Sequence, residues 1–176
     1  MKLLLTNDKI DINITSLIEK FDKKQNERQI IEVTPLQFAI DSNQEIIIQL
    51  FLSQEFFKES EKIDINKGSI ESIIGKEIEI YAKTPLCISI EKRNINAVKL
   101  LLGRTDINVN KQSFHFLGSN QIQAKTALHL AVEIEDLEVI KLLLQKKEID
   151  IEIEDCQGKK PIDYAKNDEI KQLLSQ

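Results

Sequence analysis

Few side chains in this sequence could carry out acid–base or nucleophilic chemistry. Its 176 residues include two histidines, His115 and His129, and two cysteines, Cys87 and Cys156. A nucleophilic thiol requires a neighbouring base, and a zinc site requires Cys or His ligands at short, paired spacings. No such spacing occurs, and the five glycines are scattered singly rather than gathered in a phosphate-binding loop. The sequence therefore predicts no catalytic residue, no metal site and no cofactor, and a protein that is not an enzyme.

Composition and charge exclude further classes of protein. Hydrophobic residues make up 41% of the chain and charged residues 30%, as in globular proteins, and the net charge of −5 argues against a nucleic-acid partner. No segment approaches the roughly 20 apolar residues of a membrane span. The apolar run at residues 3–5 is too short for a secretory signal.

The two cysteines give an indication of the cellular compartment in which the protein folds. Two free thiols are typical of a reducing cytosol, and a single disulfide between Cys87 and Cys156 is the alternative. We therefore expect a cytoplasmic protein that does not insert into a membrane.

The elements that position these side chains are indicated by an internal repeat. Four hexapeptides align, with an aliphatic third residue, a bulky apolar fifth residue and a small sixth residue. They are residues 34–39 (TPLQFA), 84–89 (TPLCIS), 126–131 (TALHLA) and 160–165 (KPIDYA). Small residues let two helices approach closely, and we expect the large ones to face a shared core.

A second apolar run follows each of the first three hexapeptides at a fixed offset. These runs are residues 48–52, 98–102 and 140–144, and an extended segment with an Ile-Asp-Ile-like pattern follows each. Threonine can cap the first helix of the unit, and proline suits its first turn. Each unit is thus predicted to be a helix, a tight turn, a second helix and an extended connection.

This unit resembles the ankyrin repeat, whose signature is TPLHxA at a period of about 33 residues. Residues 126–131 depart from the signature only by alanine in place of proline, and residues 155–161 (DCQGKKP) match the β-turn of the family apart from one lysine. The resemblance implies an all-α solenoid of helix-turn-helix repeats with β-hairpin or loop fingers. It also assigns His129 a structural role, with its imidazole hydrogen-bonded to backbone.

The first three hexapeptides are separated by more residues than the ankyrin period of about 33. The excess lies in the connections around residues 67–83 and 109–125, so two fingers are predicted to carry insertions. The first interval also contains extra residues around Phe56 and Phe57, which indicate a lengthened helix or loop. We expect a single domain with a half-repeat at residues 1–33, repeats at 34–83, 84–125 and 126–159, and a C-terminal cap at 160–176.

Binding positions follow from the resemblance, because such repeats bind through finger tips and through the turns after the first helices. The turn positions are Asp41, Ser42, Glu91, Lys92, Glu133 and Ile134, and the tip positions are Cys156, Gln157 and Lys159. In the inserted finger, Phe114, His115 and Phe116 form an aromatic group that could anchor a partner. The alternative is that this insertion folds back and buries the two phenylalanines against the stack.

The resemblance implies a non-catalytic scaffold or adaptor whose partner is another protein. We expect a monomer or a part of a larger assembly. Three alternatives remain open: a regulatory or targeting region excerpted from a longer polypeptide, favoured by the half-repeat at Met1, a pathogen or viral effector that captures a host protein, and, last, a redox role through Cys156.

Overall fold

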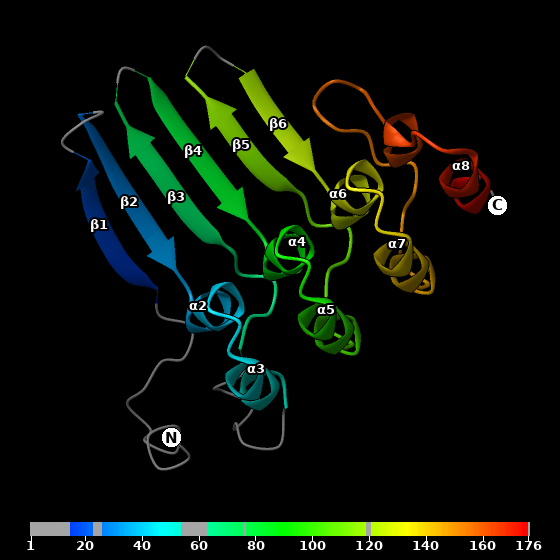
Figure 1. The fold of residues 1–176 in the computed structure, drawn as a ribbon, viewed down its shortest axis with the longest axis horizontal. Coiled ribbons are helices and arrows are strands. Elements are labelled where there is room, and N and C mark those ends of the chain that lie inside the picture. Colours follow the sequence, from blue (N-terminus) through cyan, green and yellow to red (C-terminus); the bar gives the residue numbers. More distant parts are fainter. Residues whose placement is uncertain (1–14, 23–25, 54–62, 76, 119–120, 176) are drawn as a thin grey trace.

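The computed structural model describes residues 15–22, 26–53, 63–75, 77–118 and 121–175 (Figure 1). Two expectations lie outside these residues: the helix of the half-repeat around residues 3–5, and the lengthened segment around Phe56 and Phe57. No helix in the described part of the chain has the length and apolar character of a membrane span.

Three pairs of antiparallel helices stack side by side. The pairs are α2 (Pro35–Asp41) with α3 (Glu45–Leu52), α4 (Pro85–Glu91) with α5 (Ile95–Leu102), and α6 (Ala127–Glu133) with α7 (Leu137–Leu144). Figure 1 shows the first helices as one row beside the sheet and the second helices as another row on the side away from the sheet. A 3₁₀-helix η3 (Pro161–Tyr164) and α8 (Asp168–Leu174) close the stack at the C-terminal end.

Each first helix begins at the threonine of its hexapeptide. The side chains of Thr34, Thr84 and Thr126 accept hydrogen bonds from the third following backbone N–H, which satisfies one free amide of each helix. The turn to the second helix has left-handed backbone at Asn43, and at Arg93 and Glu135 in the next two repeats. The same local structure is therefore built three times from different residues.

The core lies between the two rows of helices and is almost entirely aliphatic. The small sixth residues are buried, with Ala39 2% exposed and Ser89 and Ala131 0% exposed. The fifth residues of the hexapeptides, which were expected to face the core, are not all buried. Ile88 is buried, but Phe38 is 56% exposed, because the fifth position of the first helix faces the side of the stack on which the sheet stands.

The connections between repeats form a six-stranded antiparallel sheet, so the prediction of an all-α fold is wrong. The strands pair in chain order: β1 (Ser16–Asp22), β2 (Glu27–Val33), β3 (Ser69–Ile74), β4 (Ile78–Lys83), β5 (Ser113–Leu117) and β6 (Gln121–Lys125). The solenoid of helix pairs is present, but its fingers have merged into a sheet. The correct class is a helical solenoid with an attached antiparallel sheet.

The merging has a geometric reason. Packed helices are about 8–10 Å apart, and a hairpin of two strands, each about 4.8 Å from the next, occupies a similar width. Long hairpins that leave successive repeats therefore meet edge to edge, and β2 pairs with β3 and β4 with β5. The first hairpin, β1–β2, lies where the sequence analysis placed only a half-repeat.

Candidate functional site

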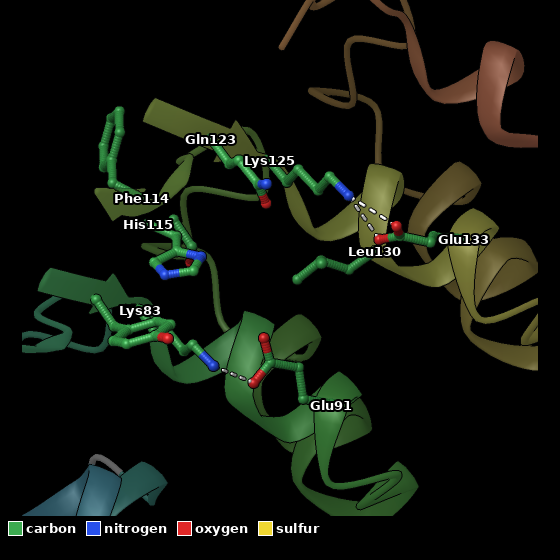
Figure 2. Close-up of a pocket in the computed structure, with 10 residues that line it drawn as sticks. Lys83, Glu91, Phe114, His115, Gln123, Lys125, Leu130 and Glu133 are labelled. Carbon is green, nitrogen blue, oxygen red and sulfur yellow. Dashed lines mark hydrogen bonds and ion pairs between the residues drawn. The ribbon is translucent and has the colours of Figure 1, made fainter. Parts of the chain in front are cut away.

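The sheet and the first helices enclose a groove, which we define by Tyr81, His115 and Gln123 of the sheet and by Leu130 of α6. Tyr81, His115 and Gln123 are cross-strand neighbours, so their side chains lie on the same face of the sheet. The groove contains a hollow of about 250 Å³. Figure 2 shows His115, Gln123 and Leu130 around it.

Two ion pairs flank the groove at equivalent places in successive repeats. Lys83 Nζ lies 2.8 Å from Glu91, and Lys125 Nζ lies 2.7 Å from Glu133 (Figure 2). Each lysine precedes the capping threonine, and each glutamate ends the first helix. The groove is therefore lined by charges that already neutralise one another.

The floor of the groove is a stacked ring pair. The rings of Tyr81 and His115 are 3.9 Å apart at an interplanar angle of 17°. The Tyr81 hydroxyl donates a 2.8 Å hydrogen bond to Glu79. Burial, this hydrogen bond and the carboxylate charge raise the pKa of Tyr81 to about 12, so the phenol stays protonated and acts as a donor. The Nε2 atom of His115 is buried without a hydrogen-bond partner among the described residues.

The predicted turn positions lie at the C-terminal ends of the first helices, and not all are free. Lys92 approaches Asp41 of the preceding repeat at 3.8 Å, and Ser42 is exposed. Glu91 and Glu133 are held in the flanking ion pairs. Ile134 is half-buried and packs against the core, so it offers little surface to a partner.

The predicted aromatic group in the inserted finger is divided between two faces of the sheet. Successive residues of a strand point to opposite faces, so His115 faces the groove while Phe114 and Phe116 face the other way. Figure 2 shows Phe114 directed away from the groove. The side chains of Phe114 and Phe116 therefore lie on the opposite face of the sheet from that of His115, although Phe114 also borders the hollow.

The tip positions surround a tight turn at Asp155. Cys156, Gln157 and Lys159 are exposed and border a second hollow of about 250 Å³, next to Gln123. Burial acts to raise the pKa of Asp155, but hydrogen bonds from the Tyr164 hydroxyl and from the backbone N–H groups of Lys159 and Gln157 outweigh it and lower the pKa. The turn is thus fixed by an ionised carboxylate.

His129 is a structural residue beneath the groove and is 0% exposed. Its Nε2 donates to the backbone carbonyl of Lys159 at 3.0 Å, so Nδ1 is the unprotonated acceptor facing the hydroxyl and backbone N–H of Thr126. The imidazole therefore connects the start of α6 to the next finger. Burial, the largest influence, lowers the pKa of His129.

We expect protonation of His129 to destabilise the protein in mild acid. An unfolded histidine has a pKa near 6.5, and the folded value is lower, so the unfolded state binds more protons below about pH 6.5. The free energy of unfolding is therefore unaffected by His129 above this pH. Below it, the free energy of unfolding falls as the pH decreases, by up to about 1.4 kcal/mol per pH unit. Urea denaturation at pH 7.5 and 5.5 measures the loss.

Two glutamine variants provide the controls. His129→Gln should remove most of this pH dependence, and glutamine already occupies the equivalent buried position as Gln37. His115→Gln should retain it. An equal pH dependence in wild type and His129→Gln would contradict the assignment.

Sequence reasoning missed Tyr81, Gln123 and Leu130 as groove residues, and it did not place Phe38 on the surface. Phe38 and Leu130 carry a usable signal, because both occupy the fifth position of a hexapeptide. Tyr81 and Gln123 could be placed only from the strand register. The connection between residues 11 and 34 is as long as the two inserted ones, so the same interval comparison would have indicated the first hairpin.

Comparisons with known proteins agree with this architecture. The family model of the ankyrin repeat matches residues 125–156. The solved ankyrin repeat domain of Bcl-3, described as a unique member of the IkappaB protein family, superimposes with a TM-score of 0.55 at 20% identity. The match covers 82% of this chain and 52% of that one, so this chain spans about half the length of the solved domain. None of the curated proteins compared with the sequence matches it.

Proposed function

Because the chain carries an ankyrin repeat and has the ankyrin-repeat fold, as its hexapeptides indicated, we propose that it is a non-catalytic module that binds another protein. Ankyrin repeats are generally protein–protein interaction modules. In this chain we place the binding surface in the groove between the sheet and the first helices. The observation that carries the proposal is the groove itself, in which apolar and aromatic side chains lie between two ion pairs.

The composition of the groove supports a protein partner. Leu130 and the Tyr81–His115 stack form an apolar and aromatic centre, and the ion pairs form a polar border. Protein interfaces have this arrangement, with charged residues depleted at the centre and tyrosine enriched.

The titratable side chains of the site support a binding role rather than a catalytic one. His129, next to the groove, is occupied by hydrogen bonds to Thr126 and Lys159, and the His115 ring in the groove is stacked on Tyr81 with its Nε2 3.9 Å from Glu79. Lys83 and Lys125 are held by glutamates. Cys87 and Cys156 are both free thiols, and this supports the proposed cytoplasmic location.

The experiment that tests the proposal compares two double variants in an affinity capture. His115→Ala/Gln123→Ala removes two groove side chains. Gln49→Ala/Lys141→Ala, on the second helices α3 and α7, is the matched control. Proteins retained from a lysate of the source organism are identified by mass spectrometry, and the affinity of a purified partner is then measured by calorimetry.

We expect the groove variant to bind at least about tenfold more weakly, because two side chains at an interface centre contribute more than about 1.4 kcal/mol. The control variant should bind like wild type, and all three proteins should unfold at similar urea concentrations. Equal affinity of wild type and groove variant, or the absence of any retained protein, would contradict the proposal.

A further inference from the structure

The face of the sheet that points away from the groove is apolar and exposed. Ten large apolar side chains are exposed in the described part of the chain, and eight of them lie on this outer face. They come from all strands except β2, and include Leu17, Phe21, Ile70, Ile80, Phe114 and Ile122. The cross-strand register places them side by side, since directly paired residues of an antiparallel sheet point to the same face.

The two faces of the sheet differ in what covers them. The groove face, which is partly covered by helices, carries polar side chains such as Gln29, Glu71 and Glu79 besides apolar ones, whereas the outer face has no element of the described chain packed on it. A soluble protein rarely exposes an apolar patch larger than a few hundred Å² without a partner. The outer face therefore has the composition of an interface.

The charges of the outer face are confined to one end. Glu19 and Arg28 form an ion pair of 2.8 Å on β1 and β2, and Glu32 lies beside them. From β3 to β6 the register leaves Ser72 as the single polar side chain on this face. The face thus has an uncharged region from β3 to β6 with charges beside it on β1 and β2, and depletion of charge at the centre is a feature of protein–protein interfaces.

The size of the face fits association with an identical face. Six strands spaced about 4.8 Å apart and about six residues long cover a flat area on the order of 600 Å². The accessible surface of the face is larger than this area, because the side chains project from the sheet. A stable dimer buries about 800 Å² of accessible surface on each partner. Two sheets can pack face to face at about 10 Å, and a two-fold axis requires only that one surface be complementary to itself.

Other modes of association fit less well. The edge strand β1 carries Glu19, Lys20 and Asp22, and charged side chains on an edge oppose the addition of a further strand. An anionic membrane would require a basic border, but Arg28 is paired with Glu19 and the net charge is −5. The net negative charge of the chain does not oppose a dimer at this place, because the centre of the face carries none of it.

We propose that two copies of this chain associate through the outer faces of their sheets and form a two-layer β-sandwich at the centre of a homodimer. The two grooves then lie on opposite sides of the dimer, free to bind partners. The sequence alone favoured a monomer or a part of a larger assembly; the apolar outer face is the structural reason for a dimer. The proposal does not depend on the proposed function, because the groove takes no part in the contact.

The test measures molar mass by sedimentation equilibrium from about 1 to 200 μM, a range that covers affinities of ordinary dimers. Ile80→Lys/Ile122→Lys places two charges on the outer face. Ile46→Lys is the matched control, because Ile46 is 82% exposed on α3, away from the sheet. We expect wild type and Ile46→Lys to form dimers, and the double variant to be monomeric with unchanged circular dichroism.

Ile80→Thr/Ile122→Thr repeats the test without charge if the lysine variant does not fold, since threonine keeps the β-branched shape. The dissociation constant of its dimer should be at least tenfold higher than that of the wild-type dimer. A wild-type protein that stays monomeric over the whole range overturns the proposal. So does a dimer whose stability the outer-face variants leave unchanged, or a mass that grows beyond the dimer with concentration.

Discussion

Ala131→Asp is expected to abolish the cooperative unfolding of this protein. Ala131 is 0% exposed in the middle of α6, and its neighbours in the core are aliphatic. A carboxylate there would be buried without a partner, or would be protonated and still lack hydrogen bonds. Such substitutions cost more than about 4 kcal/mol, a large part of the 5–15 kcal/mol of a typical domain.

The measurement is thermal and urea denaturation followed by circular dichroism at 222 nm. Ala131→Ser is the matched control, since the equivalent position in the preceding repeat is Ser89, whose buried hydroxyl donates to the carbonyl of Pro85 at 2.8 Å. Serine at 131 should be tolerated by the same hydrogen bond within α6. A sigmoidal transition of Ala131→Asp close to that of wild type would refute the close packing of α6.

The second large effect is expected at the base of the sheet, in Gly68→Ala. A Cβ atom at Gly68 would lie 2.0 Å from the backbone oxygen of Lys83 and 2.7 Å from its carbonyl carbon. Neither atom can rotate away, because Lys83 ends β4 and immediately precedes Thr84, the N-cap of α4. The backbone must therefore shift, and overpacking of this kind costs about 1–3 kcal/mol.

Urea denaturation of Gly68→Ala gives the loss of stability, and amide chemical shifts show where the backbone has moved. The largest shifts should occur in β3, β4 and the first turn of α4. Gly103→Ala is the matched control, since its Cβ would make ordinary contacts at 3.4 Å to the backbone of α5. Equal stability of the two variants would show that β3 does not approach β4 as closely as described.

The helices were predictable because they depend on short-range rules. Thr84 caps α4 and Pro85 follows it, and the same pattern recurs at Thr34 and Pro35. The alternation of large and small residues then determines which side of each helix is buried, so Leu128 and Ala131 could be assigned to the core. His129 was assigned a structural role because it stands at the fourth position of a recurring hexapeptide, and the resemblance rests on this recurrence.

The sheet was not predictable in the same way. The residues of each finger can form a hairpin alone, but the pairing of β2 with β3 and of β4 with β5 joins segments about 40 residues apart through contacts that the stacking of the helices creates. The faces of the strands depend on that register, and a change of one residue exchanges the two faces. The sequence could therefore name Phe114, His115 and Phe116 together, and only the structure could place them on opposite sides.

The sequence by itself thus determined the repeat, the caps, the burial of the third and sixth positions of the first three hexapeptides and the family resemblance, because each of these rests on short local patterns that recur along the chain. Tertiary structure decided that the fingers join into one sheet, that Tyr81, His115 and Gln123 meet in a groove, and that the apolar residues of five strands share an outer face. The physical reason is that these contacts depend on the distance between stacked helices matching the width of a hairpin, a property that no single repeat contains.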